Sequence, residues 1–146
     1  SVDHLESMDE PAINALAGST TIGTLLPTAA FFLRMPYQPA RKLIDSNCAI
    51  ALASDFNPGS SPSGNMNFVV AVSCIQMKML PEEAINAATI NGAYAMDLQN
   101  EVGSITVGKK ANLIITKKIP ALSFLPYSFA HNLIDTVLIN GEFTQT

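Results

Sequence analysis

Residues 48–53, CAIALA, form a short apolar run without a polar face, and a loop rich in serine and glycine follows at residues 54–64. A strand of this composition must be covered by protein on both faces, which is typical of parallel sheets that carry helices. A loop of this length without regular structure is usually functional or disordered. We therefore predict a helix-covered parallel sheet with a long loop after one of its strands.

The order of the other segments up to about residue 98 favours the same architecture. Short β-rich segments alternate with segments that carry helix-start and helix-stop residues. The further predicted strands are residues 2–5 and 20–26, and the predicted helices are residues 9–17, 38–46, 67–79 and 81–98. This alternation is the element order of an α/β fold, whose functional loops follow the carboxyl ends of the strands.

The predicted helices also indicate where the core lies. Gly92 interrupts the helix predicted at residues 81–98, so we expect a kink or a close helix contact there. Four methionines at helical spacings are expected to fill gaps in the core: Met66, Met77, Met79 and Met96. Cys48 and Cys74 lie in apolar runs and are expected to be buried free thiols, which favours a reducing cytoplasm as the location.

The pattern changes after residue 100. Residues 111–116 are a strand candidate, and residues 134–144 contain Asn140-Gly141, a strong signal for a two-residue hairpin turn. We therefore predict that residues 100–146 are β structure without helices. A unit this small with unpaired edges does not stand alone, so we expect it to complete a sheet supplied elsewhere.

Composition limits the possible partners. The chain is 48% apolar and 14% charged, which suits either a piece buried on something larger or a compact domain with a big core. Its net charge of −4 argues against nucleic acid and anionic membrane surfaces as partners. No apolar stretch approaches the roughly 20 residues of a membrane span. The chain opens with SVDHLES and no Met, so we expect it to come from within a longer protein.

Two polar clusters follow predicted strands. One is Asp3-His4-Leu5-Glu6, and the other is Ser54-Asp55-Phe56-Asn57-Pro58-Gly59-Ser60. In a parallel sheet both open onto the same edge, where an imidazole and a carboxylate could bind a metal or share a water. The structural alternative is a histidine satisfied by its neighbours and an aspartate that only forms a turn.

The sequences that carry these clusters resemble one family. IALASDFNPGSSPSGNM resembles the last-strand signature of imidazolonepropionases in the amidohydrolase superfamily, and SVDHLE resembles their sixth strand end. PEEAINAATINGAYAMDLQNEVGSITVGKKANLII resembles the general amidohydrolase tail. The resemblance implies an α/β fold. Residues 1–99 would be strands six to eight of a (β/α)8 barrel, and residues 100–146 the C-terminal strands of a small β-sandwich.

The resemblance also implies roles for individual residues. Asp55 would be a metal ligand and the group that takes a proton from the attacking water, because a carboxylate suits both tasks. His4 would stand beside the metal and polarise or orient the substrate carbonyl. Asn57 and Gly59 would contact the ring-opened product, and Ser60 the imidazolone substrate.

The implied reaction is hydrolysis of 4-imidazolone-5-propanoate to N-formimidoyl-L-glutamate, in histidine degradation, with Zn or Fe as cofactor. The family's remaining ligands are histidines that this chain lacks, since it contains only His4 and His131. His131 lies in the β tail, where a structural role is expected. Glu6 matches the family pattern but has no assigned role. We therefore expect that this chain alone binds metal weakly and turns nothing over.

Other functions and partners follow from the same residues. A related amidohydrolase, such as a deaminase acting on another cyclic amide or amidine, is one alternative, although the Asn57-Pro58-Gly59 loop argues against it. A non-catalytic remnant that pairs with the missing part or packs as an oligomerisation module is another. The expected partners are a small-molecule substrate, the rest of the barrel and, at full length, a second copy in a homodimer.

Overall fold

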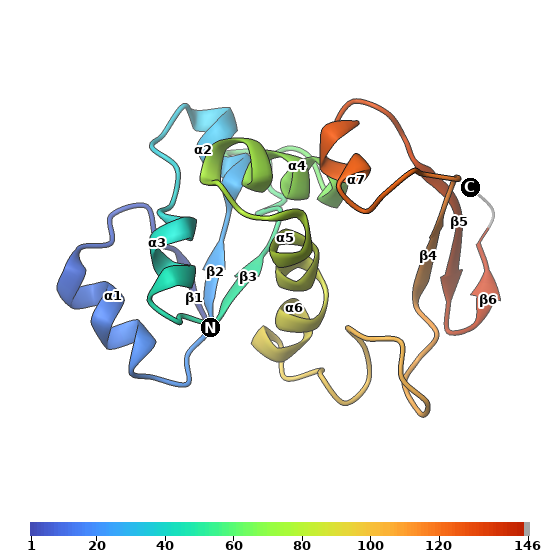
Figure 1. The fold of residues 1–146 in the computed structure, drawn as a ribbon, viewed down its shortest axis with the longest axis horizontal. Helices are drawn as coiled ribbons and strands as arrows, with labels where there is room; N and C mark the ends of the chain where they lie inside the picture. Colours follow the sequence, from blue (N-terminus) through green and yellow to red (C-terminus); the bar gives the residue numbers. More distant parts are fainter. Residues whose placement is uncertain (145–146) are drawn as a thin grey trace.

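Two three-stranded sheets, one parallel and one antiparallel, organise the computed structural model, which describes residues 1–144 (Figure 1). The strands are β1 Val2–His4, β2 Gly23–Leu25, β3 Ile50–Leu52, β4 Leu113–Thr116, β5 Ile134–Ile139 and β6 Glu142–Phe143. The helices are α1 Glu10–Ala17, α2 Pro27–Leu33, α3 Ala40–Asp45, α4 Met66–Met77, α5 Pro81–Ala88, α6 Ile90–Ala95 and α7 Phe124–Tyr127.

The parallel sheet has the order β1-β2-β3. Its register places His4 beside Leu25 and Leu25 beside Leu52, so the carboxyl ends of all three strands lie at one edge. Every residue of β2 and β3 is buried, whereas β1 is exposed along its length. The prediction of a parallel sheet covered by helices is confirmed.

The core lies between this sheet and the helices that flank it. Leu25, Ile50 and Leu52 contribute from the strands. Buried residues of the flanking helices that join the same cluster are Ile13, Leu16, Leu43, Val69, Ala84 and Ala87. Met77 and Met79 are buried as expected, but the expectation for Met96 was wrong, because 64% of its surface is exposed. It follows the last turn of α6, past the end of the packed face.

The helix predicted at residues 81–98 is two helices, α5 and α6. The break falls at Thr89, with φ −122° and ψ −86°, and not at Gly92, which lies inside α6. The Thr89 hydroxyl donates to the carbonyl of Ile85, 2.7 Å away. A hydroxyl bonded to the carbonyl four residues earlier bends a helix, which accounts for the position of the break.

Helix α2 was missed from the sequence. The strand predicted at residues 20–26 stops before Pro27, but this proline does not begin a loop: it occupies the first turn of α2, where its missing N–H costs little. The helix packs on α4 through an edge-to-face contact of Phe31 with Phe68, whose ring centroids are 5.2 Å apart. α2 therefore starts directly at the carboxyl edge of the sheet.

The antiparallel sheet has the order β4-β5-β6. Asn140 and Gly141 turn the chain between β5 and β6 with φ of 53° and 84°, as the hairpin signal predicted. The prediction of β structure without helices was incomplete, because α7 lies between β4 and β5 and packs against α4. Its four residues are too few to leave a periodic pattern, and contact with α4 supports them.

Among residues 1–144, no helix combines the length and the apolar character needed to cross a membrane.

Candidate active site at the carboxyl edge of the parallel sheet

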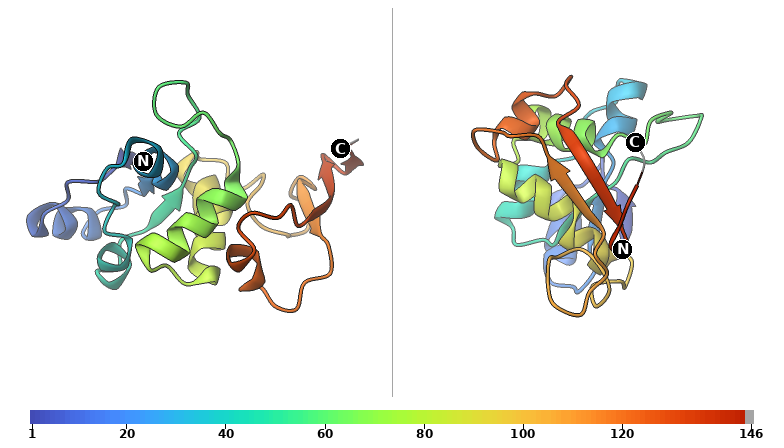
Figure 2. Two further views of the ribbon diagram at one scale, coloured as in Figure 1. Left: turned by 90° about the horizontal axis from the view of Figure 1, so that it is seen from above. Right: turned by 90° about the vertical axis from the view of Figure 1, so that its right-hand side faces the viewer.

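The two predicted clusters lie at the same edge of the parallel sheet. His4 is the last residue of β1, and Asp55 follows the last residue of β3 by three positions. β2 lies between these strands, so the structure does not place the two side chains at opposite ends of the fold. The loop that carries Asp55 projects outward from this edge (Figure 2).

Asp55 is held by its own loop. Its Oδ2 accepts a hydrogen bond of 2.7 Å from the Ser60 hydroxyl, which in turn accepts from the Asn57 amide at 2.6 Å. The Asn57 amide also donates to the Asp55 carbonyl at 2.7 Å. Asn57 Oδ1 accepts from the backbone N–H groups of Gly59 and Ser60. Residues assigned to the substrate from the sequence thus form the turn that orients the carboxylate.

The backbone at Asp55 is in the left-handed region, with φ 53°. Such a conformation costs free energy and persists only where the surroundings fix it. Thr28, which is 4% exposed in α2, donates from its hydroxyl to the Ser54 carbonyl at 2.9 Å. This bond ties the residue before Asp55 to α2. Thr28 was not identified from the sequence, because the helix that carries it was not predicted.

A second network holds His4. Its Nδ1 lies 3.3 Å from Glu6 Oε1, and the same oxygen accepts a 2.7 Å hydrogen bond from the Gln38 amide. Gln38 is 2% exposed, and the Glu6 side chain 13% exposed, whereas the His4 side chain is 56% exposed. Glu6 thus receives a structural role that the sequence did not assign. Gln38 was missed because no local pattern links it to a residue 32 positions away.

The donor chemistry at this edge fits part of a metal site. A carboxylate and an imidazole are ligand types that Zn and Fe accept. Within the described part of the chain, however, no three His, Cys, Asp or Glu side chains gather closely enough to hold an ion. His131 is exposed after α7 and bonds to Ser128. A complete site therefore needs ligands from elsewhere.

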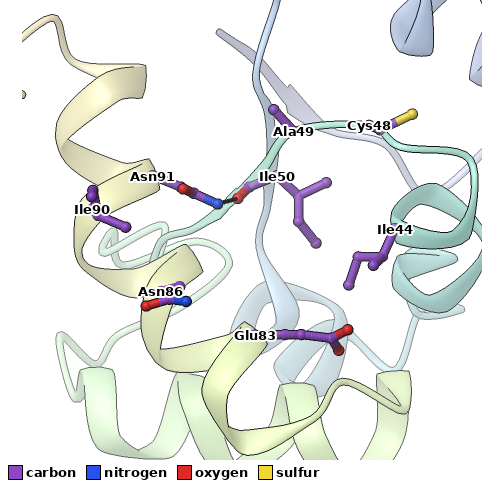
Figure 3. Close-up of a pocket in the computed structure, with 8 residues that line it drawn as sticks. All are labelled: Ile44, Cys48, Ala49, Ile50, Glu83, Asn86, Ile90 and Asn91. Carbon is purple, nitrogen blue, oxygen red and sulfur yellow. Dashed lines mark hydrogen bonds between the residues drawn. The ribbon is translucent and has the colours of Figure 1, made fainter.

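A pocket lies at the opposite edge, where β3 begins (Figure 3). Asn91 donates to the Ile50 carbonyl across it at 2.8 Å. Glu83 also lines the pocket, and its hydrogen bond with Arg41 lowers the pKa of the Glu83 carboxyl. Burial raises the pKa of the Cys48 thiol, which also lines the pocket. Burial thus favours the protonated form of this thiol, which is the less nucleophilic one.

The chain has relatives of known family. Residues 4–144 match the amidohydrolase family. Imidazolonepropionases of Christiangramia forsetii and Flavobacterium johnsoniae are 61% and 62% identical over 142 residues, 97% of this chain and 34% of each relative. That of Porphyromonas gingivalis is 45% identical over 146 residues. The chain thus spans about a third of the length of these curated relatives.

Solved structures share the fold at low identity. An adenosine deaminase from Xanthomonas campestris with bound zinc superposes with a TM-score of 0.86 at 24% identity, over 97% of this chain and 36% of that one. The guanine deaminase of E. coli gives 0.81 at 15% identity, over 98% of this chain and 38% of that one. These likenesses concern the α/β architecture alone, with its parallel and antiparallel sheets.

Proposed function

This chain belongs to the amidohydrolase family, and from that premise we propose that it forms the C-terminal third of an imidazolonepropionase. The main observation behind this proposal is that the Ser60 hydroxyl orients the Asp55 carboxylate at the sheet edge where His4 also lies. Identity of 61% to imidazolonepropionases across 97% of the chain supports this substrate over other cyclic amides.

In the whole protein, residues 1–99 supply strands six to eight of a (β/α)8 barrel as β1, β2 and β3. Residues 100–146 supply the C-terminal strands of a small sandwich. The parallel order of β1-β2-β3 and the uncovered antiparallel sheet support this division. The part of the relatives outside this chain supplies the remaining strands.

The proposed reaction is hydrolysis of 4-imidazolone-5-propanoate to N-formimidoyl-L-glutamate. Asp55 takes a proton from the attacking water, whose oxygen forms a new bond to the ring carbonyl carbon. The ring C–N bond then breaks, and Asp55 returns the proton to the leaving nitrogen. His4 orients the carbonyl, while Asn57, Gly59 and Ser60 line the place where substrate and product lie.

The proposed cofactor is a Zn or Fe ion with Asp55 as one ligand. The chemistry that such an ion supplies is acidification of water and polarisation of a carbonyl. The further ligands belong to the part of the relatives outside this chain, so this chain alone binds metal weakly and is inactive. We further propose that the whole protein lies in the reducing cytoplasm and forms a homodimer.

The test is Asp55→Asn in the whole protein. Asparagine keeps the shape but cannot accept a proton, so imidazolone propionate hydrolysis should fall by about 10³-fold or more. Asp135→Asn, at an exposed position of β5, is the matched control and should retain activity. Circular dichroism should show the same fold in all three proteins.

Substantial turnover by the Asp55→Asn protein would refute the role of Asp55. Absence of imidazolone hydrolysis in the whole wild-type protein, together with turnover of guanine or adenosine, would replace the proposed substrate with that of a related deaminase.

A further inference from the structure

We propose that Gln38 is a positioning residue of the active site. Its amide holds the Glu6 carboxylate, and Glu6 in turn fixes the His4 imidazole at the carboxyl edge of the sheet. The expected effect of Gln38 on activity rests on the proposed function, whereas its expected effect on the His4 imidazole does not.

The first observation is the burial of Gln38. The residue lies just before α3 and is 2% exposed, although glutamine is mostly found at protein surfaces. Its Nε2 donates to Glu6 Oε1 over 2.7 Å, while its Oε1 is buried without a hydrogen-bond partner among residues 1–144. Burying an amide oxygen without a partner costs free energy, so the bond to Glu6 must offset that cost.

Charge fixes which end of the amide faces Glu6. If the amide were turned over, its oxygen would lie against a carboxylate oxygen, and two acceptors would repel each other. A donor facing an ionised acceptor instead makes a charge-assisted hydrogen bond, which is stronger than a neutral one. Gln38 Oε1 therefore points away from Glu6 because Gln38 Nε2 donates to the Glu6 carboxylate.

The second observation is that one oxygen serves both partners. Glu6 Oε1 accepts from Gln38 and also lies 3.3 Å from His4 Nδ1. A carboxylate can only accept, so Nδ1 must carry a proton for this contact to be a hydrogen bond. The hydrogen bond at one ring nitrogen decides which nitrogen is protonated, and Nε2 is left as the free nitrogen of His4.

The third observation is that His4 has little else to hold it. Its side chain is 56% exposed, and its backbone has φ 76° at the open edge strand. Glu6 is better buried, at 13% side-chain exposure, and Gln38 is anchored in the packed part of the fold. Glu6 therefore holds the His4 imidazole in place, and Gln38 holds Glu6.

The test that does not depend on activity is nitrogen NMR of the whole protein, ¹⁵N-labelled at histidine and freed of metal by chelation. The His4 signals are assigned by their loss in His4→Gln. At about pH 9, where an ordinary imidazole is neutral, wild type should carry its proton on Nδ1. Gln38→Met, which keeps side-chain length but removes the donor, should shift the proton toward Nε2. Gln76→Met, at an exposed position of α4, is the matched control and should leave the His4 signals unchanged.

The activity arm compares kcat with KM. Misplacement of the imidazole that orients the substrate carbonyl forfeits part of its contribution, so Gln38→Met should lower kcat by about tenfold with a smaller change in KM. Gln76→Met should match wild type. If the whole wild-type protein does not hydrolyse imidazolone propionate, the proposed function fails, and the NMR result still decides the role of Gln38.

An unchanged His4 spectrum in a folded Gln38→Met protein would overturn the proposal. If that variant does not fold, Gln38→Asn tests the same contact, because its shorter side chain carries the amide away from Glu6. A shift of the His4 proton away from Nδ1 in Gln38→Asn supports the proposal, and an unshifted proton refutes it.

Discussion

The two sheets of this chain differ in what covers them. All six residues of β2 and β3 are buried, whereas no residue of β4, β5 or β6 within residues 113–143 is buried. In the right-hand view of Figure 2 no other segment lies in front of the antiparallel sheet. The first sheet has a core of its own, while the second has regular hydrogen bonding without one.

The two sheets also differ in the setting of their positive-φ residues. His4, the last residue of β1, and Asp55, which follows β3, have positive φ at the carboxyl edge of the parallel sheet. A packed framework can hold such conformations, because its other contacts offset their cost. In the antiparallel sheet the positive φ values fall at Asn140 and Gly141, where the hairpin turn itself requires them.

The largest expected effect contrasts one buried and one exposed residue. Leu25 is fully buried in β2, so Leu25→Ala should destabilise the chain by about 4 kcal/mol. Ile114 in β4 is 60% exposed, so Ile114→Ala should cost no more than about 0.5 kcal/mol. Urea unfolding followed by circular dichroism measures both. Equal costs at the two positions would mean that the antiparallel sheet has a core after all.

A smaller effect concerns the segment that joins the two regions. Gly103 has φ +89°, and a Cβ there would lie 2.6 Å from the Ala93 Cβ and 3.1 Å from the Ile90 Cα in α6. Gly103→Ala should therefore cost about 2–3 kcal/mol, from both the backbone conformation and the overlap.

Gly108 is the control, since it has φ +93° but open space around its Cα. Gly108→Ala should cost only about 1 kcal/mol, from the backbone conformation alone. If urea unfolding gave the same cost for both variants, the close approach of Gly103 to α6 would not contribute to stability.

The smallest effect concerns an ion pair of the helix-covered region. Arg41 in α3 bonds to both carboxylate oxygens of Glu83 in α5, which lowers the pKa of Glu83 below its ordinary value of 4.5. The contribution of this pair is therefore complete above about pH 4.5 and is lost as pH falls through the lower folded pKa.

Glu83→Gln should lower the urea midpoint at pH 7, and its difference from wild type should shrink below pH 4.5. Glu82→Gln, at the exposed neighbouring position, should show less of this dependence. A Glu83→Gln difference that stayed constant with pH would show that the pair does not respond to titration.

Much of the helix-covered region could be predicted from local residues. Asp9 caps α1 by accepting from the Ala12 N–H, and the apolar run at residues 48–53 contains β3. Helix α2 was missed because Pro27 suits both the end of a strand and the start of a helix. The break at Thr89 was misplaced because a hydroxyl that bonds four residues back leaves no distinct sequence pattern.

In the candidate site, too, some residues could be identified from the sequence and others could not. Asp55 and His4 could be identified because both follow predicted strands and match a family pattern. Gln38 and Thr28 could not, since each acts through a hydrogen bond to a residue more than 25 positions away. The roles of Asn57, Gly59 and Ser60 toward substrate stay predictions.

The sequence by itself determined the alternation of strands and helices, the hairpin turn and the residues that follow the strands, because burial patterns and turn chemistry act over a few neighbouring residues. Only the tertiary structure decided that Gln38 reaches Glu6 and that Thr28 supports Ser54. It also decided that the antiparallel sheet lies uncovered. These contacts join segments far apart in the chain, and only chain folding brings their polar atoms within hydrogen-bond distance.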